Sequence, residues 1–596
     1  MDRTGIIVVS LCAVLLVFWF YEQRKEEERW QQQQAQITAT NIVEMAPTAT
    51  ASPGGVAPAF ASPFDTNIPE TTIVLTNAHA RYTFTSRGGG LELVELLDYP
   101  ETISARWKTQ NTSSSNGVAT LNTRAPVPVL AILGNTNLVG DGNFDLARTD
   151  DGVRAEKLLP DGLRLVKEFH LSSNYLVDAS VQLENTTDKP LMLPEQEWVV
   201  GTATPMDVDD SSFSYYGGAM WFDGKSVVNR GVSYFNTNTT TLFGIIPRTP
   251  TPEYRAGDGN VVWAAAHNQF FALLAMPEKP AQQVFARPVV LPPPAENPLA
   301  RLVGIETALI YPAQTLTANQ AVERKIVFFA GPKEYRVLAR VGEEFQNRAD
   351  LAMQFGFFGF FAKALLVAMN WLHDVTTLGY GWVIVVLTVL LRAVFWPLTA
   401  ASTRSMKRMQ ALAPEVKALK EKYKDDPQKF TQKQMELWKK NKVNPMSGCL
   451  PMVIQMPVFF GFYAMLRSAI ELRGAHFLWV ADLTKPDTLF MIPGLTFIPF
   501  ISTPQGLPFN LLPLLMVAVM VWQAHLQPPS PGMDPAQQKM MRYLPLMMLL
   551  FLYNYSSGMA LYMTVSTLMS VVQNKLTRTM QKTAAPVLTP PQKTKK

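Results

Sequence analysis

LGYGWVIVVLTVLLRAVFWPLT, residues Leu378 to Thr399, is a long apolar run that contains one charged side chain, Arg392. At about 1.5 Å per helical residue, the arginine starts roughly 21 Å from Leu378 and roughly 15 Å from Ser402, which is too deep for easy snorkelling. A central arginine costs about 3 kcal/mol even on lenient insertion scales, so it needs water, an acidic partner or a substrate. The pattern predicts a wet cavity within a membrane. The alternative is a snorkelling or internally paired arginine.

The apolar residues of this 596-residue chain, 47% of the total, are unevenly distributed. Residues 31–350 have the composition of a soluble protein, whereas residues 355–575 consist largely of Leu, Val, Met and Phe runs typical of membrane helices. After the run with Arg392, four further spans are predicted, at Cys449–Ile470, Asn510–Leu526, Tyr543–Tyr555 and Met559–Gln573. The last two are short for a hydrocarbon core of about 30 Å. They indicate either a locally thinned bilayer or helices that extend past their apolar parts.

The N-terminal part of the chain predicts a membrane anchor followed by a linker. The apolar segment Gly5 to Tyr21 ends in bulky aromatic residues rather than small ones, so we predict an uncleaved anchor within residues 1–30. Residues 31–70 are rich in Gln, Ala, Thr and Pro and predict a flexible linker. The two cysteines, Cys12 and Cys449, lie in apolar segments, so no disulfide framework is expected in the soluble domain.

Residues 71–332 alternate between short apolar-polar segments, such as Arg164 to His170, and turns. This pattern predicts an all-β sandwich. The histidines of this region show neither the spacing of a metal site nor a nucleophile motif; they are His79, His170 and His267. We therefore favour a scaffold over a catalytic domain.

Residues 333–377 place Lys363, Asn370 and Asp374 at seven- and four-residue steps, which is typical of an amphipathic helix lying in the membrane interface. An additional transmembrane helix is the alternative. With the interfacial helix, a single span separates the soluble domain from the basic loop that follows. Residues 22 to about 377 are then predicted outside the cytoplasm.

The loop at residues 400–447 is rich in lysine and arginine, which in a short loop indicates the cytoplasmic side of the membrane. Its apolar residues recur every three or four positions until Asp425-Asp426-Pro427 interrupts them, so we predict a helical hairpin. The cationic surface is suited to anionic lipid or RNA, or is simply solvated. The basic tail, residues 576–596, is predicted on the same side.

Several motifs of the chain are similar to one known family. The run Asn444-Pro445-Met446-Ser447-Gly448-Cys449-Leu450-Pro451, continuing to Gln455-Met456-Pro457, closely resembles the opening of the third span of YidC membrane protein insertases. Shorter matches are Leu391-Arg392 with Trp396-Pro397-Leu398, Asp534-Pro535 with Gln537-Gln538-Lys539, Ser557-Gly558 with Leu561-Tyr562, and Gly331-Pro332-Lys333. The resemblance covers essentially the whole chain after the linker and is most specific in the membrane half.

The resemblance implies a multi-domain protein of the bacterial inner membrane with six spans and cytoplasmic N- and C-termini. An N-terminal anchor helix would precede a periplasmic, mutarotase-like β-sandwich and an α-helical core of five transmembrane helices. The first core helix would be 378–399, and the other four would lie within 448–575 with a periplasmic loop at 471–509 and a cytoplasmic loop at 527–542. No cofactor, metal, catalytic residue or small-molecule substrate is implied.

The family's function is to insert and help fold membrane proteins. The resemblance therefore implies four kinds of partner: nascent membrane proteins, membrane lipids, the Sec translocon and, through the basic hairpin and tail, the ribosome. By matched position, the residues lining a hydrophilic substrate groove would be Arg392, Thr388, Gln455 and Ser566. Those forming a hydrophobic slide would be Met456, Phe459 and Phe551, for which ordinary interhelical packing is the alternative.

Two features depart from the family pattern. The segment Leu495 to Pro508 is apolar, proline-rich and longer than the usual connection; its role is left open between covering the outer end of the groove, lying in the membrane interface and being a neutral loop insertion. Thr567 stands where many relatives have Asn. Two other functions compete: a transporter or channel that uses the intramembrane arginine, and an anchored periplasmic carbohydrate-binding protein. The halves of 378–575 show no inverted repeat, and one anchor would suffice for a binding module.

Overall fold

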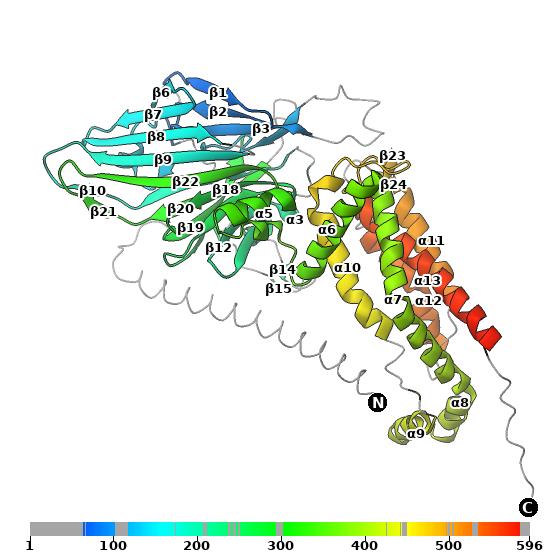
Figure 1. Cartoon of the computed structure of the whole chain (residues 1–596). Coiled ribbons are helices and arrows are strands. Elements are labelled where there is room, and N and C mark those ends of the chain that lie inside the picture. The colour runs from blue at the N-terminus through cyan, green and yellow to red at the C-terminus, as the bar shows by residue number, and fades with distance from the viewer. Residues whose placement is uncertain are drawn as a thin grey trace, which may run out of the picture. The chain divides into compact units, whose positions relative to one another are not determined.

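The structure is a computed structural model of the chain (Figure 1). It describes residues 63–65, 67–101, 117–172, 175–206, 210, 213–235, 240–241, 246–247, 251–293, 302–424, 426–441, 443, 450–495, 498, 501–503, 506–526 and 535–584. The predicted N-terminal anchor, most of the predicted linker and most of the basic tail lie outside these residues. The described residues fall into two compact units. The β unit lies within Gly55–Gly359 and Ala464–Gly474, and the helical unit lies within Phe360–Tyr463 and Ala475–Lys596.

Two large antiparallel sheets form the β unit. The nine-stranded sheet has the order β13 (Val227–Gly231), β12 (Gly218–Phe222), β17 (Trp263–His267), β18 (Phe271–Pro277), β22 (Ala321–Pro332), β9 (Leu176–Asn185), β8 (Leu163–Leu171), β7 (Gly152–Leu158) and β6 (Asp145–Arg148). The five-stranded sheet has the order β16 (Tyr254–Ala256), β19 (Gln283–Leu291), β20 (Leu302–Tyr311), β11 (Gln196–Ala203) and β5 (Ile132–Leu133). Strands β11 and β20 approach β17 from the facing sheet.

Smaller elements complete the β unit. A four-stranded sheet consists of β1 (Thr72–Thr76), β2 (Ala80–Thr85), β3 (Gly90–Pro100) and β4 (Val118–Leu121). Two strand pairs are β10 (Leu191–Leu193) with β21 (Gln314–Leu316), and β14 (Thr240–Thr241) with β15 (Ile246–Pro247). Short helices are α2 (Thr136–Val139), α3 (Phe213–Tyr216), α4 (Val232–Phe235), α5 (Tyr335–Glu344) and the 3-10 helix η2 (Ala349–Met353).

The sandwich core follows from the alternating pattern of its strands. In β8, Leu163, Leu165, Lys167 and Phe169 are buried at two-residue steps, because successive side chains of a strand point to opposite faces. The facing sheets bury Trp198 and Trp263 almost completely. An indole N–H needs a partner when buried, and Trp263 donates to the Asn347 carbonyl at 3.0 Å. The all-β domain predicted from the sequence is confirmed.

The end of helix α10 (Leu450–Ser468) and the 3-10 helix η4 (Ile470–Leu472) are also part of the β unit. Arg473 donates to the Glu101 carbonyl at 2.8 Å, and its guanidinium lies 5.4 Å from the ring centroid of Phe271. Gln269 donates to the Arg467 carbonyl at 3.0 Å. These contacts fasten residues 464–474 to the strands.

The helical unit contains the remaining long helices (Figure 1). They are α6 (Gly359–Thr376), α7 (Tyr380–Ala411), α8 (Ala413–Lys422), α9 (Pro427–Lys440), most of α10, α11 (Leu511–Leu526), α12 (Pro535–Leu552) and α13 (Ser557–Ala584). Among the described residues, no helix alone has the length and apolar composition of a membrane span, while α6 and residues Tyr380–Val394 of α7 have them as a pair bent by 117°. Strands β23 (Thr488–Ile492) and β24 (Leu507–Asn510) pair between α10 and α11.

Two differences from the predicted elements have simple causes. The region 333–377 is divided between α5, which belongs to the β unit, and α6, with a left-handed residue, Gly356 (φ 71°), between them. On α6, Asn370 is buried, whereas Lys363 and Asp374 are exposed, so the three do not share one exposed face. Helices α12 and α13 extend past their apolar segments, which agrees with the second of the two interpretations of those short spans.

Candidate functional site

Arg392 lies on α7 and hydrogen-bonds a side chain of α13. Its Nε donates to Ser566 Oγ at 3.0 Å, and its Nη2 also donates to Ser566. The two helices are joined again where Gln573 donates to the Arg392 carbonyl at 2.7 Å. A guanidinium has five N–H donors, so Ser566 takes two, and the other three have no protein acceptor among the described residues. No described carboxylate pairs with Arg392, so its charge is not neutralised by this part of the protein.

The polar contacts continue from α13 to α10. Gln455 Nε2 donates to the Tyr562 hydroxyl at 2.9 Å, and Tyr562 also hydrogen-bonds Ser566 one turn further along α13. The Tyr562 ring stacks on Phe462, with centroids 4.1 Å apart and planes at 15°. Four side chains, Gln455, Tyr562, Ser566 and Arg392, thus form a polar chain that links α10, α13 and α7. We call this set the polar chain.

Sequence reasoning assigned no site role to Tyr562, although three of the four members of the polar chain were predicted. Its hydroxyl bridges Gln455 and Ser566, which lie on different helices. The one available signal was its spacing, because residues four apart on a helix share a face. Tyr562 and Ser566 have that spacing, but nothing local to α13 indicates that Gln455 faces them.

Thr388, which was predicted to line the groove, lies one turn before Arg392 on α7 and does not join the polar chain by a hydrogen bond in the described structure. Its hydroxyl donates to the Ile384 carbonyl of its own helix at 2.6 Å, and the residue is 1% exposed. Thr567 makes the same kind of bond, to the Met563 carbonyl at 2.7 Å. Such a bond to the backbone satisfies a hydroxyl inside an apolar helix. Thr567 therefore has a polar side chain but does not contribute to the polar chain.

The three residues predicted for a hydrophobic slide come from two helices. Met456 and Phe459 lie on α10, and Phe551 lies on α12. Met456 is 39% exposed and Phe551 is 62% exposed, whereas Phe459 is half-buried. Exposed long apolar side chains indicate contact with lipid or with an apolar partner.

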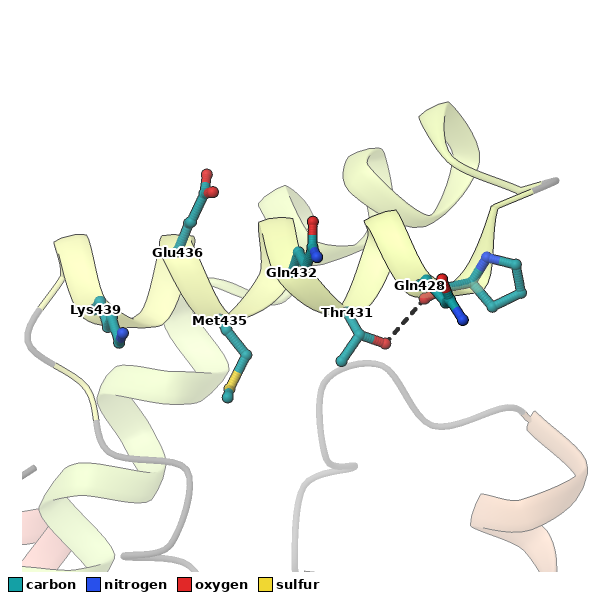
Figure 2. A pocket seen from close by; sticks show the side chains of 7 residues that line it. Gln428, Thr431, Gln432, Met435, Glu436 and Lys439 are labelled. Carbon is teal, nitrogen blue, oxygen red and sulfur yellow. Dashed lines mark hydrogen bonds between the residues drawn. The ribbon is translucent and has the colours of Figure 1, made fainter.

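A shallow hollow of about 680 Å³ lies elsewhere, along α9. All of its described lining residues belong to that helix, and Figure 2 shows Thr431 and Met435 pointing to one side while Glu436 points away. None of the predicted site residues lines it. Helix α9 starts where Asp426 Oδ1 accepts from the Lys429 amide at 2.9 Å, which is an N-cap. Of the predicted break at Asp425-Asp426-Pro427, Asp426 and Pro427 form the start of α9, and Asp425 lies outside the described residues.

Known protein families match nearly the whole described part of the chain. Residues 72–368 match the YidC periplasmic domain family, and residues 371–584 match the 60Kd inner membrane protein family. Membrane protein insertase YidC of Burkholderia cenocepacia is 30% identical over 443 residues, which cover 74% of this chain and 70% of the relative. The corresponding protein of Syntrophobacter fumaroxidans is 34% identical over 417 residues, which cover 70% of this chain and 68% of the relative.

These matches define a class, the bacterial membrane protein insertases that carry an all-β domain ahead of a helical unit. The chain belongs to the YidC family. It is accordingly an inner-membrane insertase whose substrates are membrane proteins, and the resemblance seen in its motifs is confirmed. Insertion moves a polypeptide between solvents and does not itself make or break a covalent bond.

Two solved structures are also similar to the chain. A crystal structure described as an active YidC insertase with its first transmembrane domain resolved has 16% sequence identity and a TM-score of 0.33, with 86% of this chain and 94% of that chain covered. A putative aldose 1-epimerase from Escherichia coli K12 has 12% identity and a TM-score of 0.26, with 44% of this chain and 99% of that chain covered.

Proposed function

We propose that insertion proceeds through a hydrophilic groove between α7, α10 and α13, with Arg392 as its main polar group. The observation that carries this proposal is the polar chain, which gathers Arg392, Gln455 and Ser566 from three helices. Thr388, one turn before Arg392 on α7, lines the same groove in this proposal. An arginine without a carboxylate partner in the described part of the chain retains N–H donors for water or for a substrate.

The proposed mechanism begins when a short polar segment of a nascent membrane protein enters the groove from the cytoplasm. Arg392 attracts acidic segments most strongly, because Coulomb attraction is poorly screened where water is scarce. The apolar helix of the substrate then leaves sideways into lipid along Met456, Phe459 and Phe551. Transfer of that helix from water to hydrocarbon supplies the driving force, so no nucleotide is required.

We further propose the topology and partners that the sequence predicts. The protein has six spans, an N-terminal anchor within residues 1–30 and cytoplasmic termini, with the β unit in the periplasm. The α8–α9 hairpin and residues 576–596 contact the ribosome, and the Sec translocon assists with some substrates. The exposed lysines of α8 and α9 support the first contact, because ribosomal RNA is an anionic surface.

The β unit is proposed as a mutarotase-like scaffold without sugar chemistry of its own. His267, which is 3% exposed, supports a structural role. One ring nitrogen lies 3.1 Å from the Asn268 carbonyl and the other 3.1 Å from Asn229 Oδ1. Burial lowers the pKa of this imidazole well below its ordinary value, so it stays neutral in a site closed to solvent.

The groove is tested by reconstituting purified protein in lipid vesicles and measuring protease protection of inserted substrates. Two substrates are compared, one with a neutral and one with an acidic translocated segment. Arg392→Ala is expected to reduce insertion, with the larger loss for the acidic substrate, and Arg392→Lys should retain part of that activity. Tyr562→Phe keeps the ring stack on Phe462 but removes the bridging hydroxyl, so it should reduce insertion less than Arg392→Ala does.

The matched control is Arg404→Ala, an exposed arginine near the end of the same helix. It removes the same side chain outside the polar chain and should leave the ratio between the two substrates unchanged. Equal insertion of both substrates by wild type and Arg392→Ala would reduce Arg392 to a structural residue. Failure of the wild type to insert either substrate would contradict autonomous insertion in vesicles.

A further inference from the structure

The strands β23 and β24 carry an apolar surface that the proposed mechanism does not use. Every residue of β23 is at least partly exposed, and Phe490 is 48% exposed. Its ring stacks on that of Phe509 in β24, with centroids 4.8 Å apart and planes at 9°. A two-stranded hairpin is only marginally stable in water on its own, so this apolar pair needs an apolar environment or a packing partner.

The hairpin is built firmly onto the ends of the neighbouring helices. Asn510, which is fully buried, donates from its side chain to the Tyr553 carbonyl at 2.9 Å and accepts from the Thr488 hydroxyl at 2.7 Å. The Tyr553 hydroxyl donates to the Pro508 carbonyl at 2.7 Å. Asp487 Oδ2 accepts from the Leu512 amide at 2.7 Å, at the start of α11. These bonds hold both strands in a defined place beside α11 and α12.

The sequence continues from this hairpin into α11 without a charge. No Asp, Glu, Lys or Arg occurs from Thr488 to Leu526, which includes both strands and all of α11. Strand β24 ends at Asn510 and α11 begins at Leu511, so no connecting loop separates them. Soluble edge strands are usually protected by charges, and these strands have none.

We propose that the β23–β24 hairpin lies in the membrane–water interface on the periplasmic side of the inner membrane, with Phe490 directed into the lipid at the level where α11 begins. This inference rests on the proposed topology, in which α11 spans the membrane. The partner is lipid rather than another protein because the uncharged surface is continuous with a helix of an inner-membrane protein. Interfacial segments of this kind reach about 5–10 Å below the headgroups.

The backbone sets a limit on the depth of the hairpin. The outer edges of two paired strands carry N–H and C=O groups without ladder partners, and such groups are not tolerated in hydrocarbon. The edges therefore stay at a level that water reaches. Apolar side chains on the lipid face go deeper than the backbone, so shallow lipid should surround Phe490 and Ile492, which are two residues apart on β23.

The test uses the full-length chain with both native cysteines replaced by alanine, labelled at a single new cysteine with an environment-sensitive fluorophore. Phe490→Cys is the main variant, and Ile492→Cys is the second, because it lies on the same face of β23 and leaves the Phe490–Phe509 stack intact. The proteins are reconstituted in phosphatidylethanolamine–phosphatidylglycerol vesicles that contain lipids with a nitroxide near the headgroup or near the chain end. Iodide in the water is the competing quencher.

Labels at Phe490 and Ile492 are expected to be quenched by the shallow nitroxide and to lose the iodide quenching seen at Lys485→Cys, an exposed position before the uncharged run. Iodide quenching as strong as at Lys485 would overturn the inference. Protection from both quenchers would also overturn it, because protein would then cover the hairpin. A Trp522→Cys label, at an exposed position about 16 Å along α11 from Leu511, separates the two levels. If the deep nitroxide quenches it while the hairpin labels remain in water, only this inference fails, and if it is not quenched, the proposed topology fails with it.

Discussion

Lys167 is a fully buried cation, whereas Arg392 is only partly buried. Lys167 is fully buried in the β unit, where its ammonium donates to the carbonyls of Gly88 at 2.6 Å and Leu130 at 2.7 Å. It also lies 4.4 Å from the ring centroid of Phe144. These acceptors satisfy the donors but supply no negative charge. Burial consequently lowers the pKa of Lys167 to about 7 from its ordinary value near 10.5.

The lowered pKa of Lys167 makes the free energy of unfolding depend on pH in one direction. Between pH 7 and about 10, the unfolded chain keeps a proton on Lys167 that the folded chain loses, so stability rises with pH over that range. Below pH 7 both states are protonated, and the full cost of burying the charge is present. Lys167→Met should reduce this rise in the urea midpoint of the β-sheet circular dichroism signal, and the part that remains is expected from Lys333, because burial lowers its pKa to about 7 as well.

The control for this prediction is Lys325→Met, which removes a lysine whose side chain is 65% exposed on β22. Its pH profile should run parallel to that of the wild type. If the profiles of wild type and Lys167→Met also run parallel from pH 7 to 10, the charge of Lys167 does not change in the folded protein over that range.

At the scale of the element, the start of helix α9 depends on the residue that precedes it. Asp426 caps the helix, and Pro427 follows at the first position, where a missing N–H has no cost. Asp426→Ala should destabilise the start of α9 by about 0.5–2 kcal/mol, whereas Asp426→Asn should preserve it because asparagine caps equally well. Hydrogen exchange of the α9 amides measures both. Equal exchange in the two variants would contradict a capping role.

Helix ends were less predictable than helix existence. Periodicity and the Asp425-Asp426-Pro427 break were enough to predict the α8–α9 hairpin. The apolar run at Leu378–Thr399 predicted the core of α7 but not its continuation to Ala411, because helix formation does not stop where hydropathy stops. For the same reason α13 extends to Ala584, beyond the predicted end at Gln573.

At the scale of the whole molecule, Arg473 helps to hold residues 464–474 in the β unit. It donates to the Glu101 carbonyl and lies over Phe271, next to Leu472, which is fully buried. Arg473→Ala should lower the stability of the β unit by about 1–2 kcal/mol, since a charged hydrogen bond and a cation–π contact are lost at a partly exposed site.

Thermal unfolding of the detergent-solubilised full chain measures this effect. The control is Arg148→Ala, which removes an exposed arginine of β6 and should leave the transition unchanged. A transition that moves equally in both variants would indicate a loss of general charge rather than of the Arg473 contacts.

Family motifs and periodicity predicted the all-β domain, the helical half and most of the polar chain, because these depend on local sequence. Contacts between distant segments could not be predicted in this way. Gln455 and Tyr562 are 107 residues apart, and the pairing of Asn510 with Tyr553 joins a strand to the end of another helix. Nothing local to any of these residues specifies its partner.

Pro397, inside α7, gives this helix a mechanical property of its own. A proline has no N–H, so the carbonyl of Ala393 lacks its usual helical donor, and the helix is easier to bend at this point. The arm from Pro397 to Ala411 is about 21 Å long. A tilt of roughly 10° at the proline moves its far end, and the α8–α9 hairpin attached to it, by about 4 Å. Arg392 lies before Pro397 in α7. The α8–α9 hairpin can therefore change its position by bending at the proline while Arg392 keeps its hydrogen bonds to Ser566.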